Sequence, residues 1–318
     1  MDLLEAVENG KPFSIVPKID IPDLSRGVLP VQRFGQFIRE IRESTVIVPD
    51  ARIITNMSSY EVDISRISMS VQLEPGRDPN GNKVAPTADE VAIKTNTLNV
   101  KELVTKIPIE EETIEDNIEG EQFEQTLVSL LAEGISYDIE RFFLLSDTSY
   151  TGPDTLLKIN DGWMKLAHGQ IDEGDLDNDD ESWPTNLFDV MMDTIPGRYR
   201  QKLPQMKFYV SWKLYKDYRN LLKLRETQMG DTYITTSPSL TYEGIPIQYV
   251  PAMDSLGDGK VRALLTVPTN LVYGFWRQVK VVPKPDPEMR RTEYIASMRA
   301  DCHYEDEEGA VSATIATT

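Results

Sequence analysis

The feature that most constrains this chain is a long hairpin predicted over residues 60–100, in which both strands change phase partway along. The outgoing strand has two sets of alternating apolar residues, namely Tyr60, Val62 and Ile64, then Ile67, Met69, Val71 and Leu73. The return strand likewise has Val91 and Ile93, then Leu98 and Val100. A one-residue change of phase moves side chains to the opposite face of a strand, commonly through a bulge or a sharp twist. The two halves of the hairpin are therefore expected to present their apolar side chains to different surfaces.

One register brings the two phase changes to the same level. It has three apolar pairs, namely Leu73 with Val91, Val71 with Ile93, and Ile64 with Val100. Strands of about 15 residues at ~3.3 Å per residue reach about 50 Å, and a ribbon of that length needs a covering surface to be stable. We expect the base to pack on its own chain and the outer half to pack elsewhere. Residues 75–88, rich in Pro, Gly and Asn, form the predicted turn at the tip.

A second segment without an evident partner lies at the N-terminus. Residues 1–30 contain four prolines and little periodicity, which indicates an extended arm. The arm is too apolar for a solvated tail, since it contains Phe13, Ile15, Val16, Ile19, Ile21 and Leu24. It needs a partner surface, either on its own body or on a neighbour. A short amphipathic helix is predicted after it, at about 31–43.

Helical periodicity is strongest over residues 119–145, where an acidic start suits the positive end of a helix dipole. At 1.5 Å per residue such a helix spans about 40 Å. Two more helices are predicted over 186–200 and 212–225, with a strand over 206–210 between them. The rest favours strands, over 245–250, 261–267, 271–282, 293–304 and 311–315. Pro283, Pro285 and Pro287 are expected to interrupt the strands, and the fold class is α+β.

The charge balance argues against a nucleic-acid reader. Lys and Arg total 33 against 52 Asp and Glu, a net charge of −19, whereas nucleic-acid-binding domains normally show a basic face. Such a chain repels a polyanion overall. That suits either an ordinary acidic protein or a container that must not adhere to packed DNA. Because Cys302 is the single cysteine, an intramolecular disulfide is excluded. The sequence contains no run of about 18 apolar residues, so no membrane span is predicted.

Residues for catalysis or metal binding are sparse. Metal and acid–base sites at neutral pH rely on histidine, and the chain has two, His168 and His303. Cys302 and His303 are adjacent in a predicted strand and so point to opposite faces. We expect a half-buried thiol and a surface imidazole rather than a nucleophile–base pair. The acidic run 172–181 lacks EF-hand spacing and indicates a solvated loop. No phosphate-binding loop or nucleophile-elbow motif is present, so no catalytic, cofactor-binding or metal-binding residue is predicted.

The order of elements, together with several local phrases, resembles the major capsid proteins of tailed bacteriophages, which have the Hong Kong 97-type capsid fold. The phrases are GVLPVQRFGQFIRE with REST, EDNIEGEQF leading into LLAEGISYDIERFFLLSD, INDGW, SWKLYKDYRNLL, YEGIPIQYVPAM and LLTVPTNLVYGFWR. Each phrase alone is weak, but their order extends over nearly the whole chain.

The resemblance implies a division of the chain. The expected parts are an N-terminal arm (1–44), an extended β-hairpin or E-loop (45–104), a peripheral domain with the spine helix (105–150 and 266–318) and an axial domain (151–265). It also implies hexamers and pentamers that form an icosahedral head around double-stranded DNA, without sequence-specific binding and without a membrane. A separate scaffolding protein, a portal and decoration proteins are the further partners implied. The expected location is the virion, after assembly in the host cytoplasm.

Arm and hairpin residues are the predicted contacts between subunits, and two charged zones are predicted to meet across them. The hairpin carries the basic zone, and the segment before the spine helix carries the acidic one. The predicted interface residues are Phe13, Ile15, Ile19, Ile67, Met69, Val71, Arg77, Lys83, Lys94, Glu111, Glu112, Glu115 and Asp116.

Two other readings remain open from the residues. One is an encapsulin-like nanocompartment shell of the same fold, which a cargo-docking groove would favour. The other is an enzyme with carboxylate chemistry, which a deep pocket with perturbed carboxylates would favour. The shortage of histidine argues against the enzyme.

Overall fold

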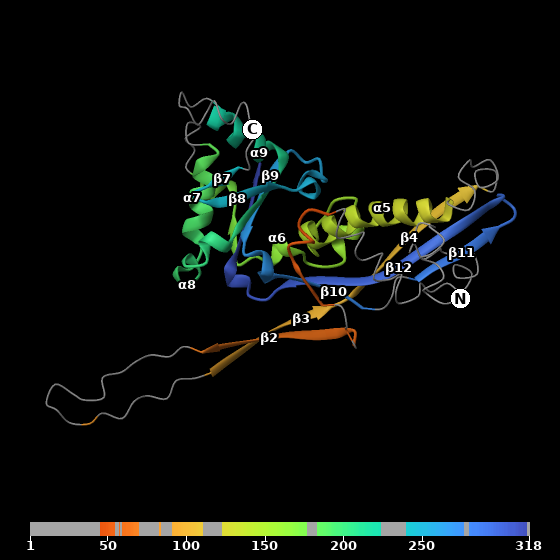
Figure 1. The fold of residues 1–318 in the computed structure, drawn as a ribbon, viewed down its shortest axis with the longest axis horizontal. Coiled ribbons are helices and arrows are strands. Elements are labelled where there is room, and N and C mark those ends of the chain that lie inside the picture. Colours follow the sequence, from red (N-terminus) through yellow and green to blue (C-terminus); the bar gives the residue numbers. More distant parts are fainter. Residues whose placement is uncertain are drawn as a thin grey trace, which may run out of the picture.

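The computed structural model describes residues 45–54, 57, 59–69, 83, 91–110, 123–176, 183–223, 240–276 and 280–316. Within them the chain forms two larger β-sheets, a long helix beside one of these sheets, and a two-stranded ribbon that leads away from the body (Figure 1). This is the mixture of helices and strands that the sequence predicts. None of these helices combines the length and the apolarity needed to span a lipid bilayer.

The first sheet has five strands and is organised around one long strand. Its members are β1 (Arg52–Ile54), β10 (Leu271–Phe275), β12 (Arg291–Tyr304), β11 (Lys280–Asp286) and β4 (Lys101–Glu110). β12 pairs antiparallel with β4, β10 and β11. The strand predicted over 271–282 is therefore two strands, because β10 and β11 pair with successive parts of β12.

Two prolines lie inside β11, which corrects the expectation that they would end a strand. Pro283 and Pro285 are paired in register with Tyr294 and Thr292 of β12. β11 is an edge strand of its sheet. A residue without a backbone N–H is tolerated there because only one side of the strand needs a hydrogen-bonded neighbour.

The second sheet has six strands, in the order β5–β13–β9–β6–β8–β7. Their bounds are β5 (Gly169–Ile171), β13 (Ala310–Ala316), β9 (Lys260–Thr266), β6 (Lys207–Val210), β8 (Ile245–Tyr249) and β7 (Thr241–Tyr242). Three helices, α7 (Thr185–Thr194), α8 (Gly197–Arg200) and α9 (Trp212–Lys223), lie on one face and share a buried apolar cluster with it. The predicted helix 186–200 is thus two helices, separated at Ile195 and Pro196.

Short helical segments connect these elements. They are α6 (Trp163–Leu166), η2 (Leu156–Lys158), η3 (Glu173–Asp175), η5 (Leu203–Gln205), η6 (Pro251–Asp254), η7 (Pro268–Asn270) and η8 (Glu307–Gly309). Residues 257–260 form a turn before β9, with positive φ at Gly257 and Gly259. A positive φ favours glycine because it lacks a Cβ atom.

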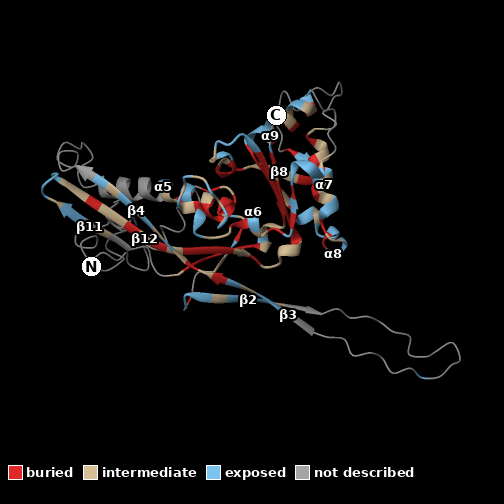
Figure 2. Ribbon diagram, turned by 180° about the vertical axis from the view of Figure 1, so that it is seen from behind, coloured by how far each residue is buried: buried red, intermediate tan, exposed pale blue. Residues whose placement is uncertain are grey.

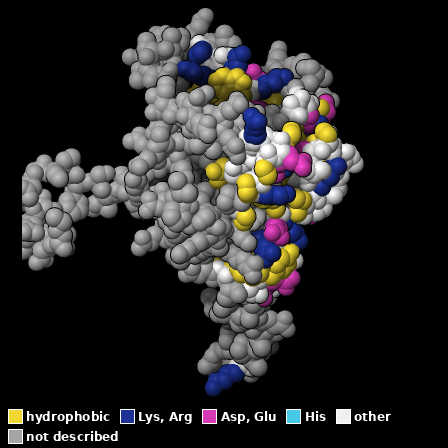
Figure 3. Space-filling model, turned by 90° about the vertical axis from the view of Figure 1, so that its right-hand side faces the viewer, with side chains coloured by type: hydrophobic (Ala, Val, Ile, Leu, Met, Phe, Trp, Pro, Cys, Tyr) yellow, Lys and Arg dark blue, Asp and Glu magenta, His cyan; other side chains and the backbone are white. Residues whose placement is uncertain are grey.

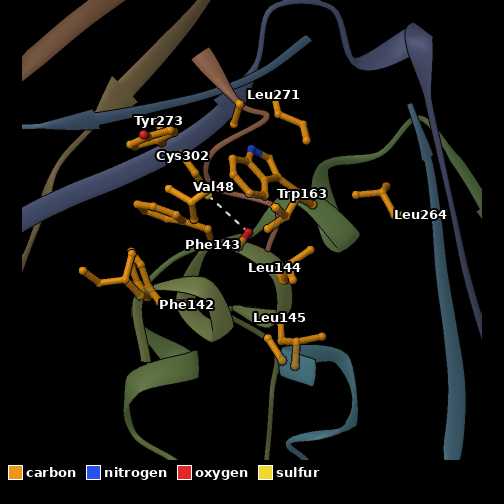
Figure 4. Close-up of a cluster of buried hydrophobic side chains, with 14 of the residues drawn as sticks. Val48, Phe142, Phe143, Leu144, Leu145, Trp163, Leu264, Leu271, Tyr273 and Cys302 are labelled. Atoms are coloured by element: carbon orange, nitrogen blue, oxygen red, sulfur yellow. Dashed lines mark hydrogen bonds between the residues drawn. The ribbon is translucent and has the colours of Figure 1, made fainter. Parts of the chain in front are cut away.

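The main core surrounds the C-terminal half of the long helix α5 (Phe123–Leu145), as Figure 4 shows. Phe143 is fully buried, and its ring centroid lies 5.5 Å from that of Trp163 and 5.4 Å from that of Tyr273. The thiol of Cys302 is also buried, not half-buried as expected, and donates to the Phe143 carbonyl oxygen at 3.4 Å. A Cβ on Gly162 would lie 2.7 Å from that same oxygen, so only glycine fits there.

The hairpin consists of β2 (Glu61–Met69) and β3 (Val91–Asn99). Its register differs from the predicted one, because Ile64 pairs with Asn96 rather than with Val100. The ladder runs without interruption from Glu61 to Met69, so the change of apolar phase occurs without a bulge. Simple alternation of side chains along a regular strand accounts for two apolar faces. The predicted register was wrong because several registers place the same apolar side chains on the same face of the ribbon. Matching of apolar residues alone cannot distinguish these registers.

Several contacts and strand pairings cross the boundaries of the predicted parts. Residues 45–54 were assigned to the hairpin, but Ile47 and Val48 are fully buried in the main core and β1 pairs with β10. β4, which begins within the predicted hairpin range, pairs with β12. β13 lies in the range assigned to the peripheral domain, 266–318, and it pairs with β9 in the second sheet. Residues 1–44, with the predicted arm and its helix, lie outside the described part.

Candidate assembly site at the base of the hairpin

An apolar cluster joins the hairpin to the first sheet. The buried members are Met57, Ile64, Leu98, Val100 and Val272, with Ile54, Val62 and Trp276 partly buried against them. A Cβ on Gly274 of β10 would lie 2.7 Å from the Met57 sulfur and 3.2 Å from a Leu98 methyl carbon. The glycine therefore lets the hairpin base approach the sheet closely. Residues on the other side of β2, such as Asp63 and Ser65, are exposed (Figure 2).

A buried carboxylate fixes the point where the hairpin leaves the sheet. Asp301 of β12 accepts hydrogen bonds from the backbone N–H groups of Asn99, at 2.5 Å, and Cys302, at 2.7 Å, and from the Asn160 side chain. Burial raises the pKa of the Asp301 carboxyl above its usual value, although these donors act in the opposite direction. The carboxyl ties the end of β3 to β12 and to the loop before α6.

An acidic turn after β12 holds the hairpin from the other side. The turn contains Glu305, Asp306, Glu307 and Glu308. Arg66 of β2 pairs with Asp306, and the Lys94 ammonium of β3 lies 2.8 Å from a Glu308 oxygen. Arg198 of α8 also pairs with Glu308. The turn therefore links the hairpin to the helices of the second sheet.

The ion pairs of this turn fix the direction of the hairpin more than they stabilise the fold. The Lys94 side chain is 59% exposed and its Glu308 partner 28% exposed, and exposed ion pairs contribute only about 0–1 kcal/mol each. The Arg66 guanidinium is less exposed and also donates to the Tyr199 hydroxyl, at 3.1 Å. Several such contacts together define the angle of the hairpin, whereas the apolar cluster and Asp301 supply most of its attachment.

The hairpin base was also compared with the expectations for metal and nucleophile sites. Among the described residues, no group of three or more His, Cys, Asp or Glu side chains could hold a metal ion. His303 lies 3.7 Å from Glu307, and Cys302 is on the opposite, buried side of β12. Burial raises the pKa of the Cys302 thiol well above its usual value, so it is no nucleophile at neutral pH.

Solved capsid structures share this fold. A chain of the satellite phage P4 procapsid with its size determination (Sid) protein superposes with a TM-score of 0.64 at 16% identity, covering 99% of this chain and 98% of that one. A chain of the native GTA particle capsid has a TM-score of 0.58 at 14% identity, with 100% of both chains covered. A chain of the bacteriophage PhiM1 mature capsid has a TM-score of 0.56 at 10% identity, covering 86% and 88%. The fold is therefore the Hong Kong 97-type capsid fold.

Sequence similarity supports the same conclusion. No protein-family model matches the chain. The prophage capsid protein YqbE of Bacillus subtilis strain 168 is 26% identical over 296 residues, covering 89% of this chain and 91% of that protein. The chain is a phage-type major capsid protein. It is a structural component of the virion and not an enzyme, which confirms the resemblance stated from the sequence.

The predicted interface residues of this capsid protein fall into three groups. Ile67 and Met69 lie in β2, paired with Ile93 and Val91 of β3. Lys83 is exposed, and Lys94 pairs with Glu308 of its own chain, which was not foreseen. The remaining residues lie outside the described part of the chain, and these are Phe13, Ile15, Ile19, Val71, Arg77, Glu111, Glu112, Glu115 and Asp116.

Sequence reasoning missed the residues that hold the hairpin of the capsid protein to its body. Neither Asp301 nor the four acids of the turn after β12 were singled out from the sequence, where they enter only through the net charge. The one available signal was position. The acids of the run YEDEEG stand between two predicted strands, where a charged turn is exposed to basic partners from other segments.

A second buried carboxylate anchors the start of the described chain of the capsid protein. Glu140 of α5 accepts hydrogen bonds from the backbone N–H groups of Val46, at 2.8 Å, and Ile47, at 2.7 Å. It is 3% exposed. Burial raises the pKa of Glu140 above its usual value, and the two N–H donors only partly oppose this.

The raised pKa of Glu140 predicts a pH dependence of stability. Between the unfolded value, about 4.3, and the higher folded value, the folded chain binds more protons than the unfolded chain. The free energy of unfolding therefore falls as pH rises through this window. Glu140→Gln keeps an oxygen acceptor but cannot ionise, so its free energy of unfolding should fall less steeply. Urea titrations of unassembled protein at several pH values measure both slopes.

The exposed Glu133, on the same helix, provides the matched control. Glu133→Gln should leave the slope as in the wild type, and Asp301, whose pKa is also raised, contributes equally in all three proteins. Equal slopes for Glu140→Gln and the wild type would refute the role assigned to Glu140.

Proposed function

We propose that this capsid protein assembles as hexamers and pentamers into the icosahedral head of a tailed phage, around double-stranded DNA. One observation carries the proposal. The ribbon β2–β3 has no third strand among the described residues and leads away from the body (Figure 1). A two-stranded ribbon is marginal in water, so its outer half needs the surface of an adjacent copy. Residues Ile67, Met69 and Val71 supply the apolar pattern for that contact.

The parts of the family fold are assigned accordingly. Residues 1–44 would form the arm, β2–β3 the E-loop, α5 the spine helix, the five-stranded sheet the peripheral domain, and the six-stranded sheet the axial domain. Two separate apolar clusters, one around α5 and one under α7 and α9, support a division into two domains. Phe13, Ile15 and Ile19 would then cover apolar surface on a neighbour.

The acidic balance suits an enclosing shell. A net charge of −19 is opposite to the basic balance of DNA-binding domains, so the shell would enclose the polymer without binding it specifically. The procapsid of satellite phage P4 includes a size determination protein. A separate scaffolding protein, a portal and decoration proteins are corresponding partners proposed for this chain.

Two oppositely charged zones would meet between subunits. The hairpin supplies Arg77, Lys83 and Lys94, and the segment before α5 supplies Glu111, Glu112, Glu115 and Asp116. Lys94 pairs with Glu308 in its own chain, but that pair is largely exposed and such pairs exchange partners at little cost. Lys83 is exposed and is the cleaner position to test.

Lys83→Glu is expected to raise the protein concentration needed for assembly by roughly threefold at low salt, since each charge contact is repeated in every subunit. Added salt should reduce the difference because it screens exposed charges. Light scattering against protein concentration measures both effects. Lys158→Glu changes another exposed lysine, on η2, and serves as the control. The same assembly curve for both variants would contradict the proposed contact.

Negative-stain microscopy and sedimentation of the purified full chain test the function itself. The expected result is closed shells of uniform size, or capsomer rings when a scaffolding protein is required. A stable monomer at high concentration that forms neither shells nor rings, alone or with the other head proteins, would contradict the proposal. Shells that carry an enzyme cargo in place of DNA would favour the nanocompartment reading.

A further inference from the structure

The hairpin carries two basic residues at one level, directly opposite each other. Arg66 of β2 and Lys94 of β3 are partners in the ladder, and like charges that face each other across two strands destabilise a ribbon. Figure 3 shows the usual arrangement on one face of the protein, where Lys and Arg side chains lie close to Asp and Glu side chains. The two cations of the hairpin need negative charge from outside the ribbon, and Asp306 and Glu308 supply it.

This basic pair lies farther out along the ribbon than the apolar attachment. Ile64 is the outermost residue of β2 in the cluster at the base, and Arg66 follows it by two residues, a distance of about 7 Å along a strand. At the inner level Asn96, the ladder partner of Ile64, donates to the Tyr304 carbonyl oxygen at 2.9 Å. Two attachments at different distances along the ribbon fix its direction, whereas a single attachment at the base would leave a pivot.

The acidic turn is itself held firmly between the two sheets. The Asn270 side chain donates to the Asp306 carbonyl oxygen and accepts from the Asp306 backbone N–H, each at 2.8 Å. The Thr266 hydroxyl donates to the Gly309 carbonyl oxygen at 3.2 Å. The turn connects β12 of the first sheet to β13 of the second. Its carboxylates therefore have a defined place relative to both sheets.

Helix α8 takes part in the same set of contacts. Arg198 pairs with Glu308, and the Tyr199 hydroxyl accepts a hydrogen bond from Arg66 at 3.1 Å. Tyr199 is buried in the apolar cluster of the second sheet. The outer attachment thus fastens the hairpin to the second sheet, while the base of the hairpin is fastened to the first.

We propose that the ion pairs of Asp306 and Glu308 with Arg66 and Lys94 set the curvature of the shell, because they fix the direction of the hairpin relative to the second sheet. The inference rests on the proposed assembly through the hairpin and names the residues that determine its geometry. Where different surfaces of identical subunits meet, the rotation from one copy to the next decides whether the array closes. The angle is repeated in every subunit, so a hairpin that pivots changes the particle size or prevents closure.

Neutralisation of the two acids tests this role. Asp306→Asn/Glu308→Gln keeps the size of both side chains and removes their charges. The variant should still form particles, but fewer than roughly half of them should have the wild-type diameter, and the rest should be open or of other sizes. Electron microscopy measures the diameters. Particles of the wild-type diameter alone would overturn the proposal. A complete loss of assembly would also overturn it, because the ion pairs would then be needed for association itself.

The direction of the hairpin can also be measured in the unassembled subunit. Spin labels on Ser65→Cys and Asn220→Cys, at exposed positions of β2 and α9, report the distance from the hairpin to the second sheet. Cys302 is buried and stays unlabelled. Asp306→Asn/Glu308→Gln should widen the distribution of this distance roughly twofold or more, because the ribbon then depends on its base alone. An unchanged width would overturn the proposal, whatever the diameters of the particles.

The matched control is Glu133→Gln/Asp193→Asn, which removes the same number of charges at exposed positions of α5 and α7. It should give particles of the wild-type diameter and an unchanged distance distribution. If the control also broadened the particle sizes, the net charge would be responsible and the proposal would be wrong. Failure of the wild type to form shells or rings would instead refute the proposed function. The distance measurement needs no assembly, so the two failures are distinct.

Discussion

Phe143→Ala is expected to lower the free energy of unfolding of the subunit by about 3–5 kcal/mol, the usual cost of a phenylalanine removed from a packed core. Phe143 is fully buried. Its ring contacts the rings of Trp163, Tyr273 and Phe275, which come from two other elements. These rings belong to α6 and β10, so they cannot close the cavity without moving a helix or a strand. Denaturant unfolding of the unassembled subunit measures the loss.

Tyr137→Ala removes another aromatic ring from the same helix at a position 44% exposed. It should cost less than about 1 kcal/mol, because exposed substitutions have small effects. If the two variants lost similar stability, the C-terminal half of α5 would not be the centre of the core.

Replacement of residues 67–93 by the dipeptide Asn-Gly is expected to abolish particle formation while the body still folds. Arg66 and Lys94 are partners in the ladder, so a two-residue turn of this type can close the shortened hairpin. Ile64, Leu98 and Val100 remain in the apolar cluster at the base. The variant should therefore unfold at the same denaturant concentration as the unassembled full chain. Sedimentation and microscopy would show no shells, because the outer ribbon is the proposed contact between copies.

A control for the hairpin is Asp63→Ala/Thr97→Ala, which removes an exposed side-chain hydrogen bond of 2.7 Å on the inner half. That variant should assemble normally, since both residues lie on the side of the ribbon that faces away from the body. Shells of the usual size from the shortened chain would show that the ribbon is dispensable, and the proposed mode of assembly would be wrong.

Local patterns in the sequence were sufficient for most elements. Helical periodicity in α5 and alternation in β12 and β13 can be recognised within short windows of sequence, and so can the strand β6 before α9. These elements agree with the predicted ones to within a few residues. Prolines were misjudged in β11 because the pattern does not say whether a strand lies at an edge. Helix 186–200 was predicted whole although Pro196 lies within it, and in the structure α7 ends at Thr194 and α8 begins at Gly197.

The sequence alone determined the class of elements, their order, the scarcity of catalytic side chains and, through that order, the resemblance to phage capsid proteins. Only the tertiary structure decided the hairpin register, the place of β13 in the second sheet, and the roles of Asp301, Glu140 and the acidic turn after β12. The physical reason is distance along the chain. A carboxylate such as Asp301 acts on Asn99 and Asn160, which are remote in sequence, and nothing in a short window records which remote N–H group a folded chain brings to it.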